Sequence, residues 1–349
     1  MKKLKDFEKE INKCSKCGLC QSSCPVYHAT GNECAVSKGK FVMLSGVLKG
    51  DLKLSDKINS YLDLCLNCDK CSKFCPAGIN VCEILQTAKY EYISNKKFFK
   101  IIKLFHCALE KFINLANRIS EPFRVKSLQS KRAILYFKGC ANKIYPRTEN
   151  SLKKLLNKAG IELVDADFSC CGLPFFSSGD LEKYEEAKAL NTELINQSTA
   201  EYILTDCASC ESTIKRYGTI NKKFINAEAL IAELRLKFKF KKKQKITFHR
   251  PCHIEDTDFL EKILQACENV EFIEIPESCC GLAGEFIFKK PRIAAMLMKK
   301  RASEIKNSGA DIVLTSCPAC VIGLKTALFG TKIKIMNMLD FLSNAEIIK

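Results

Sequence analysis

The sequence lacks several features that would place it in common classes of protein. No stretch approaches the roughly 18 consecutive apolar residues of a membrane-spanning helix, so we expect no transmembrane segment. It has no glycine fingerprint of the G-x-G-x-x-G type and no convincing nucleophile–base arrangement, so we expect the chemistry on a substrate to lie on another chain. It also has no helix-turn-helix, zinc-finger or aromatic RNA-binding signature, so nucleic acid is not an expected partner.

Acidic residues are scarce compared with basic ones. The chain has 39 Asp and Glu against 56 Lys and Arg, a formal net charge of +17. This excess favours an acidic partner or peripheral association with an anionic membrane surface, although a lysine-rich proteome explains it equally well. The first residues, Met1 to Asp6, are charged where a secreted chain would carry an apolar signal region. We expect a cytoplasmic location, which includes the inner face of the cell membrane.

Cysteine, in contrast, is abundant, with 22 residues in a chain of 349. Disulfide frameworks of this density belong to short secreted chains, whereas reduced thiols in the cytoplasm bind metals or do redox chemistry. The cysteines therefore point to metal sites.

Eight of the cysteines form two copies of one motif, C-x2-C-x2-C-x3-C-P, which is the spacing that iron–sulfur clusters require. The copies are Cys14, Cys17, Cys20, Cys24, Pro25 and Cys65, Cys68, Cys71, Cys75, Pro76. Three closely spaced thiolates reach one cluster, while the fourth, before the proline, ligates the cluster of the other copy. We therefore predict two [4Fe–4S] clusters, the first held by Cys14, Cys17, Cys20 and Cys75 and the second by Cys65, Cys68, Cys71 and Cys24.

The residues around these motifs have helical patterns. Apolar positions predict helices over 4–13, 38–48 and 79–93, and Ser55 is a suitable N-cap for a further helix. Helices between the two motifs indicate an α-helical ferredoxin domain, similar to that of the iron–sulfur subunits of fumarate reductases. We assign it to residues 1–95, with the motifs in about 5–34 and 56–85.

Residues 96–131 are predicted to be a helical linker. The segment 98–119 has a broad apolar and basic helical face that suits packing on its own domains, binding to a partner or contact with a membrane surface, and 120–131 has the composition of a hinge. Beyond residue 132 the pattern changes to short strands that alternate with helices: strands at 133–137, 162–164 and 202–205, and helices at 148–158 and 181–197. This alternation predicts α/β layers.

A second repeat appears when the chain is shifted by about 110 residues. Each copy has an upstream cysteine, a Cys-Cys-Gly-Leu sequence and a C-x-x-C pair, and the cysteines follow the predicted strands. The first set is Cys140, Cys170, Cys171, Cys207 and Cys210, and the second is Cys252, Cys279, Cys280, Cys317 and Cys320. We assign the copies to residues 132–240 and 241–349. Strand ends are where open α/β folds place their ligand sites, so each set is a candidate metal site.

The chemistry of these two sets has more than one interpretation. Five soft thiolates suit an iron–sulfur cluster, but four of them would suit tetrahedral zinc, and C-x-x-C pairs also form redox disulfides. His249 and His253 flank Cys252, and we expect them to act outside the set of ligands. Cys34, Cys82, Cys107 and Cys267 remain unassigned and are expected to be small buried apolar side chains. The lysine-rich run 237–245 alternates like an edge strand, but we expect a solvated connector.

The whole order of motifs resembles the iron–sulfur subunit of glycolate oxidase and its relatives, which include heterodisulfide reductase subunits and the corresponding subunit of anaerobic glycerol-3-phosphate dehydrogenase. The resemblance implies an α+β multidomain chain, in which an α-helical ferredoxin domain precedes two repeated α/β cysteine-rich (CCG) domains. It also implies that each complete five-cysteine set can hold a non-cubane [4Fe–4S] cluster, so one or two such clusters would join the two of the ferredoxin domain, with zinc less favoured.

The resemblance further implies a function and partners. The chain would be the electron-transfer subunit of a flavin-linked oxidase or dehydrogenase of 2-hydroxy acids such as glycolate or lactate. An FAD-linked partner subunit would deliver electrons, and a quinone or a membrane acceptor would receive them. Two alternatives stay open at this point: the CCG clusters themselves reduce a disulfide, as in heterodisulfide reductases, or the chain is a binding module stapled by zinc.

Overall fold

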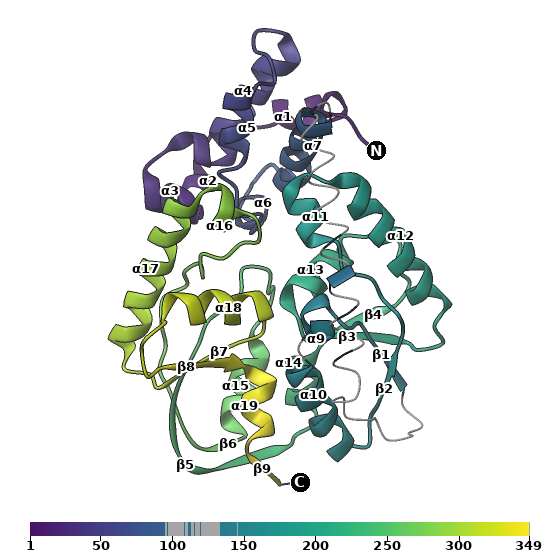
Figure 1. The fold of residues 1–349 in the computed structure, drawn as a ribbon, viewed down its shortest axis with the longest axis vertical. Coiled ribbons are helices and arrows are strands. Elements are labelled where there is room, and N and C mark those ends of the chain that lie inside the picture. Colours follow the sequence, from purple (N-terminus) through teal and green to yellow (C-terminus); the bar gives the residue numbers. More distant parts are fainter. Residues whose placement is uncertain are drawn as a thin grey trace. The chain divides into compact units, whose positions relative to one another are not determined.

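The computed structural model describes residues 1–94, 133–144 and 146–348, together with isolated positions between 96 and 119. The chain divides into two compact units. Figure 1 labels their helices and strands. The first contains residues 1–107, 174–184 and 279–301, and the second contains 108–173, 185–278 and 302–349. The first unit therefore joins the ferredoxin segment to one short segment from each CCG repeat. Most of the predicted linker, including the helix over 98–119 and the hinge over 120–131, lies outside the described residues.

The first unit is helical throughout its described part. Its elements are η1 (Leu4–Phe7), α1 (Glu8–Asn12), α2 (Leu19–Ser22), α3 (Pro25–Thr30), η2 (Glu33–Ala35), α4 (Ser37–Lys49), α5 (Asp56–Leu62), α6 (Lys70–Lys73), α7 (Val81–Ser94), α11 (Leu173–Ser178) and α16 (Phe286–Lys289). It also contains the first turns of α12 (Leu181–Gln197) and α17 (Pro291–Ser308). The helices predicted around the two motifs are confirmed.

Local chemistry explains where two of these helices begin and end. The Ser55 side chain accepts a hydrogen bond from the Ile58 amide, so Ser55 is the N-cap of α5 as predicted. Gly50, with φ of 84°, ends α4 in a left-handed conformation that favours glycine. Phe41 and Leu44 on α4 join Leu62 and Leu85 in one apolar core. Cys14, Cys65, Cys71 and Cys75 pack against that core, which thus supports both cysteine motifs.

The second unit contains two sheets with the same order of strands. The first sheet has the order β2-β1-β3-β4, from β1 (Ala133–Tyr136), β2 (Glu162–Asp165), β3 (Tyr202–Thr205) and β4 (Lys223–Asn226), all parallel. The second has the order β6-β5-β7-β8, from β5 (Lys237–Phe248), β6 (Cys267–Phe272), β7 (Ile312–Thr315) and β8 (Lys334–Asn337), also parallel, with β9 (Glu346–Ile348) antiparallel to β5. The internal repeat of the sequence is thus a repeat of topology.

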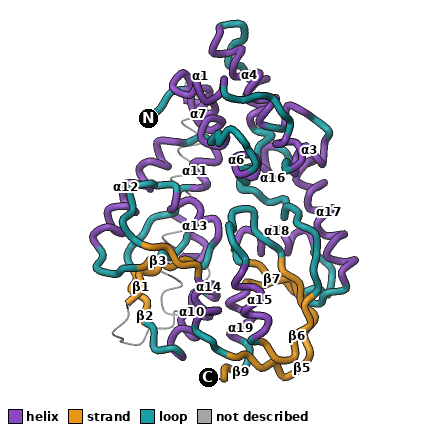
Figure 2. The backbone as a smooth tube through the Cα atoms, turned by 180° about the vertical axis from the view of Figure 1, so that it is seen from behind, coloured by secondary structure: helices purple, strands orange, loops and turns teal. Residues whose placement is uncertain are grey.

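Helices from both repeats fill the space between the two sheets (Figure 2). Further helices are α9 (Cys140–Ile144), α10 (Arg147–Lys158), α13 (Ala208–Lys215), α14 (Ala227–Glu233), α15 (Asp258–Gln265), α18 (Pro318–Ala327) and α19 (Met338–Ser343). Helix α10 packs on α19, and α14 packs on α15. Each contact pairs a helix between the first two strands of one repeat with the helix after the fourth strand of the other. The two repeats consequently share one apolar core.

The prediction of a solvated connector at 237–245 is wrong. These residues form the first part of β5, which is an inner strand of its sheet and pairs with β6 and β9. Phe238 and Phe240 are buried, whereas Lys237, Lys239 and Lys241 are exposed. The alternation of charge and aromatic residue therefore follows the two faces of a strand. Within the described part of the chain, no helix has the length and apolar character needed to cross a membrane.

Candidate iron–sulfur sites

The two ferredoxin-type motifs have the same backbone conformation. Lys16 and Asn67, between the first two cysteines of each copy, have φ of 59° and 52°. Gly18 and Asp69, after the second cysteine of each copy, have φ of 86° and 59°. Residues other than glycine seldom adopt a left-handed conformation. Its occurrence at equivalent positions of both motifs indicates that the two loops have the same turn. Each turn brings closely spaced cysteine side chains to one side of the chain.

The first pocket gathers cysteines from both motifs. It is lined by Cys14, Cys17, Cys20, Cys71 and Cys75. Lys16, Lys38 and Pro76 also line it, and Cys17 is exposed. The four cysteines predicted to ligate the first cluster thus lie around one pocket at the surface of the unit.

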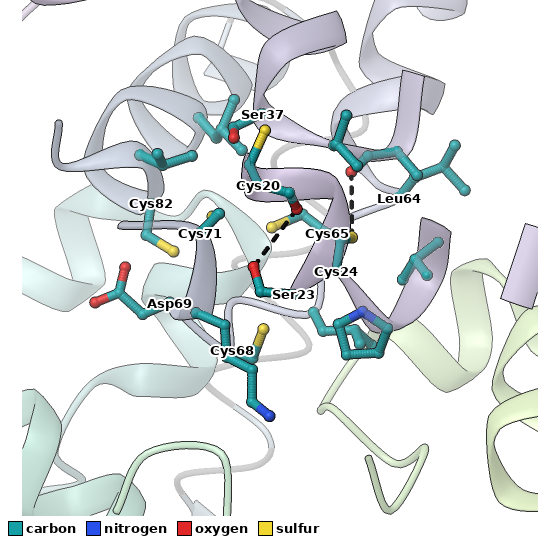
Figure 3. Close-up of a pocket in the computed structure, with 18 of the residues that line it drawn as sticks. Cys20, Ser23, Cys24, Ser37, Leu64, Cys65, Cys68, Asp69, Cys71 and Cys82 are labelled. Atoms are coloured by element: carbon teal, nitrogen blue, oxygen red, sulfur yellow. Dashed lines mark hydrogen bonds between the residues drawn. The ribbon is translucent and has the colours of Figure 1, made fainter. Parts of the chain in front are cut away.

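The second pocket also combines the two motifs (Figure 3). It is lined by Cys20, Cys24, Cys65, Cys68, Cys71 and Cys82. Cys20 and Cys71 line both pockets, which are therefore neighbours. The backbone amide of Asn67 donates to Cys65 Sγ at 3.4 Å. An amide aimed at sulfur stabilises a thiolate, which is the form that binds iron.

The thiols of the second pocket differ in acidity because their surroundings differ. The pKa of Cys65 is lowered to about 6, mainly by a hydrogen bond with the Cys82 thiol and also by the charge of Lys40 and the Asn67 amide, against the effect of burial. Burial raises the pKa of Cys24 and Cys71. A bound metal would offset this effect of burial, because metal coordination favours the thiolate. The donor set fits an iron–sulfur cluster.

The first CCG set forms a continuous chain of thiol contacts. Cys140 hydrogen-bonds with Cys170, Cys170 with Cys171, Cys171 with Cys210, and Cys210 with Cys207. The pKa of Cys171 is lowered by its hydrogen bonds with Cys170 and Cys210. A Cβ atom added to Gly139 would lie 3.1 Å from Cys210 Sγ, so the backbone here approaches the thiols closely. All five cysteines of this set thus lie together, as a shared metal centre requires.

The topology of the sheet explains why these cysteines meet. Cys140 follows β1 and Cys207 follows β3, and these neighbouring strands are the point where the strand order reverses. Open α/β sheets bind ligands at such a point, beyond the carboxyl ends of the strands. Cys207 is also the N-cap residue of α13, and Cys317 is that of α18. The partial positive charge of a helix N-terminus favours a thiolate at both positions.

The second CCG set is divided between the two units. Cys252, Cys317 and Cys320 belong to the second unit, and Cys279 and Cys280 belong to the first. Cys279 Sγ accepts a hydrogen bond from the Gly281 amide at 3.3 Å. Gly172 and Gly281, the glycines of the two Cys-Cys-Gly sequences, both have φ of 82°, which favours glycine.

The two C-x-x-C pairs meet inside the second unit. Cys317 hydrogen-bonds with both Cys320 and Cys207, and the contact with Cys207 joins the two CCG sets. The Ala208 amide donates to the Ser316 carbonyl oxygen at 3.1 Å, which joins the two loops. The loops that carry the pairs are therefore in direct contact.

The remaining candidates have varied surroundings. His249 is fully buried, and His253 Nδ1 lies 3.0 Å from Ser209 Oγ, which in turn lies 3.6 Å from Cys317 Sγ. Cys34 and Cys267 are half-buried, and Cys107 lies outside the described residues. Cys82 is buried as expected, but sequence reasoning missed its contact with Cys65, because no motif includes it. Cys82 is the second residue of α7 and lies just beyond the second motif, and this position could have indicated a contact with that motif.

Family models support the interpretation of both kinds of motif. A 4Fe-4S dicluster domain matches residues 10–79, and a cysteine-rich domain matches twice, at 134–215 and 246–325. The chain belongs to the iron–sulfur proteins that join a 4Fe-4S dicluster domain to two cysteine-rich domains.

Known proteins of this kind are similar over most of the chain. An uncharacterized iron-sulfur protein of Methanocaldococcus jannaschii is 28% identical over 96% of this chain and 73% of its own length. The glycolate oxidase iron-sulfur subunit of Escherichia coli is 23% identical over 91% and 90%. One of the subunits of the dihydromethanophenazine:CoB–CoM heterodisulfide reductase of Methanosarcina barkeri is 25% identical over 89% and 87%.

A solved structure is similar in fold. The crystal structure of a hypothetical protein from Helicobacter pylori has a TM-score of 0.54 at 10% identity and covers 89% of this chain and 68% of that one. At this identity the likeness concerns the fold alone. Taken with the relatives, the chain is an iron–sulfur protein of the kind that serves as a subunit of oxidoreductases.

Proposed function

We propose that this chain is the electron-transfer subunit of a flavin-linked oxidase or dehydrogenase of 2-hydroxy acids of the glycolate or lactate type. The observation that carries the proposal is the pair of neighbouring pockets, each lined by cysteines of both motifs. In this proposal Cys14, Cys17, Cys20 and Cys75 hold one [4Fe–4S] cluster, and Cys65, Cys68, Cys71 and Cys24 hold the other. Cys140, Cys170, Cys171, Cys207 and Cys210 form a third site, and the second CCG set a fourth.

Such clusters carry one electron each. The residues of the chain determine the distance between clusters and the stability of each charge state. Oxidation of a 2-hydroxy acid to a 2-keto acid on a flavoprotein partner releases two electrons and two protons. This chain would carry these electrons one at a time to an acceptor such as a quinone, which would take up two electrons and two protons. Cys20 and Cys71 line both pockets, so carriers held in the two pockets would be neighbours.

Replacing a ligand of either ferredoxin-type site tests this function. We expect Cys17→Ser and Cys68→Ser each to stop electron delivery to a quinone analogue, while reduction of the partner's flavin by the 2-hydroxy acid continues. The measurement is stopped-flow absorbance of the anaerobic complex, with flavin and quinone followed separately. Cys34→Ser is the matched control, because Cys34 lies in the same domain but lines neither pocket, and its delivery rate should equal that of the wild type.

Two results would contradict the proposal. If Cys17→Ser abolishes flavin reduction in a complex that still assembles, the chain takes part in substrate chemistry. If anaerobically purified protein contains zinc and nearly no iron or sulfide, the chain is a zinc-stapled binding module and carries no electrons.

A disulfide reductase is the second candidate, and one observation favours it. Cys207 and Cys317, from the two CCG sets, hydrogen-bond with each other, so a disulfide bound there would contact both sets. Its reduction to two thiols needs two electrons and two protons, and two one-electron sites side by side suit that requirement. The test is whether a thiol or disulfide changes the EPR spectrum of the CCG clusters with no flavoprotein present. A change favours this candidate, and an unchanged spectrum favours the first.

A quinone acceptor would place the chain at the cytoplasmic face of a membrane, held there peripherally. The net charge of +17 supports attraction to anionic lipid. On β5, Lys239 and Lys243 pair with Glu268 and Glu271 at 3.8 and 2.8 Å, which reduces the positive field of this strand. The net charge of the whole chain thus supports a location at the membrane surface better than the lysines of β5 do.

A further inference from the structure

Lys40 is a buried cation beside the second pocket. Its side chain lies on α4, and the residue is 1% exposed. Its ammonium donates to the carbonyl oxygens of Ala35 and of Leu64, the latter at 3.3 Å. Among the described residues, no carboxylate lies within ion-pair distance of it. A buried charge is strongly disfavoured unless another charge compensates it, so the arrangement requires an anion nearby.

A cluster held by thiolates in the second pocket would be such an anion, and Lys40 is placed to compensate its charge. Lys40 lines this pocket together with Cys24, Cys65, Cys68 and Cys71. The ammonium also holds the carbonyl of Leu64, the residue directly before Cys65.

Cys82 is a second buried group at the same place. It is 1% exposed, lines the pocket from α7 and hydrogen-bonds with Cys65 through its thiol. Cys82 is not one of the four proposed ligands, so its thiol is available as the donor of the pair. A ligand sulfur that accepts a hydrogen bond carries less negative charge.

The first pocket has no comparable groups. Of the lysines that line it, Lys16 is exposed, and Lys38 is paired with Glu33 at 3.4 Å. Cys17 of this pocket is itself exposed, so water stabilises added negative charge there. None of the cysteines that line the second pocket is exposed, so there the protein must supply more of that stabilisation.

We propose that Lys40 and Cys82 set the reduction potential of the second cluster, Lys40 as a buried counter-charge and Cys82 as a hydrogen-bond donor to the sulfur of Cys65. The inference rests on the proposed function, in which Cys24, Cys65, Cys68 and Cys71 hold a [4Fe–4S] cluster. Adding one electron increases the negative charge in the pocket, and burial opposes this. A fixed positive charge and a donor to sulfur favour the reduced form, and so raise the potential. Neither residue gains or loses a proton in the process.

The experiment replaces Lys40 with a neutral side chain of similar length. We expect Lys40→Met to lower the midpoint potential of the second cluster. At a fixed ambient potential, the ratio of reduced to oxidised second cluster should fall at least about tenfold. For one electron, a tenfold change corresponds to a shift of about 59 mV in the midpoint potential. The midpoint of the first cluster should not change. Lys40→Arg keeps the charge and should stay within the error of the wild type. Lys38→Met, two residues away on the same helix, should leave the second cluster unchanged.

The measurement is an anaerobic redox titration of the full-length, cluster-loaded chain followed by EPR. The signals are assigned beforehand with Cys17→Ser and Cys68→Ser, each of which perturbs one cluster. Iron and sulfide content shows whether a variant keeps its clusters. The inference is overturned if Lys40→Met keeps its iron and both midpoints equal those of the wild type.

Two variants of Cys82 test the inference independently, which keeps it testable if Lys40→Met does not fold. Cys82→Ala removes the donor and should lower the same midpoint, whereas Cys82→Ser keeps a hydroxyl donor and should restore most of it. Equal midpoints for Ala and Ser would overturn the role of Cys82. If the wild-type chain holds no [4Fe–4S] signal that depends on Cys68, the proposed function itself fails, and this result is distinct from unchanged midpoints in a loaded chain.

Discussion

Single residues distinguish the two CCG repeats, although their topology is the same. In the first repeat the buried carboxylate of Asp206 accepts hydrogen bonds from Tyr136 at 3.1 Å and from Asn142 at 2.6 Å. Burial raises the pKa of Asp206 to about 6, against the effect of these two donors. The equivalent positions of the second repeat are Phe248, Ile254 and Ser316, which form no such network. Only the first repeat therefore keeps a buried acid directly beside its C-x-x-C pair.

Glu228, a second buried acid of the first repeat, should make stability depend on pH. It is 0% exposed, and burial raises its pKa from 4.5 to about 8, while the Ser316 hydroxyl acts in the opposite direction. An unfolded chain ionises Glu228 above pH 4.5, whereas the folded chain resists ionisation until about pH 8. The folded state then holds more protons, so stability falls across this window by up to about 1.4 kcal/mol per pH unit.

We therefore expect Glu228→Gln to stabilise the second unit at pH 8 by more than at pH 5. The measurement is urea unfolding of the chain at both pH values. Glu233→Gln, an exposed change at the end of the same helix, should shift stability by less than about 0.5 kcal/mol at either pH. A gain for Glu228→Gln that is equal at pH 5 and pH 8 would show that ionisation of Glu228 is not the cause.

At the scale of elements, one carboxylate links three parts of the first unit. Asp63 follows α5 and pairs with Lys89 of α7 at 3.0 Å and with Lys289 of α16 at 3.4 Å. Lys89 also donates to the carbonyl oxygen of Ser177 in α11 at 3.0 Å. Helix α11 begins at the leucine of the first Cys-Cys-Gly-Leu sequence, and α16 begins four residues after the second. A hydrogen bond from Lys89 and the charge pair between Asp63 and Lys289 thus join the ferredoxin helices to segments of both CCG repeats.

Removing this carboxylate should destabilise the unit strongly. The side chains of Lys89 and Asp63 are 4% and 11% exposed, and burial already lowers the pKa of Lys89. Asp63→Asn leaves the ammonium of Lys89 without its counter-charge, which costs about 3 kcal/mol or more. Hydrogen exchange of the α7 amides measures the loss.

A surface pair provides the control for Asp63. Glu201 and Lys223 lie 3.3 Å apart with side chains 65% and 72% exposed, and Glu201→Gln should change stability by less than about 1 kcal/mol. If Asp63→Asn and Glu201→Gln each lower stability by less than about 1 kcal/mol, water screens the pair of Asp63 and Lys89, and this pair does not hold the helices together.

At the scale of the molecule, the two CCG repeats of the second unit form one cooperative body. Their sheets share a single core, which α10 and α14 build with α15 and α19. Polar contacts cross the same boundary: Ser151 of α10 donates to Asp340 of α19 at 2.8 Å, and Lys154 donates to the Ser343 carbonyl oxygen at 2.6 Å. Neither repeat buries its helices without the other.

A cavity in the helix of one repeat should therefore loosen both sheets. Leu155 of α10 is 0% exposed in the shared core, and Leu155→Ala should destabilise the unit by about 2–5 kcal/mol. We expect amide protection to fall in β5 and β7 as well as in β1 and β3. Val164→Ala on β2, where the side chain is 38% exposed, should leave both sheets protected. Loss confined to the first sheet would mean that the repeats unfold separately.

The local features of this protein depend on residues that are close together in the chain. The spacing of the cysteine motifs, the helices around them and the alternation of strands and helices after residue 132 were all predictable, because helix, strand and ligand spacing depend on residues close in the chain. The family matches agree with both kinds of motif. The limits of the domains stay predictions, and so do the sets of ligands, which metal analysis of cysteine variants can test.

Tertiary structure decided the features that depend on contacts distant in sequence. The run 237–245 was predicted to be solvated because its lysines dominate the composition, but the pairing with β6 and β9 makes it a strand. No motif contains Lys40 or Cys82, and only the packing of α4 and α7 brings them to the second pocket. The cysteine motifs therefore predict where a cluster binds, while the surroundings of that site depend on the fold. Burial and hydrogen bonding, which set a potential, are properties of the packed chain.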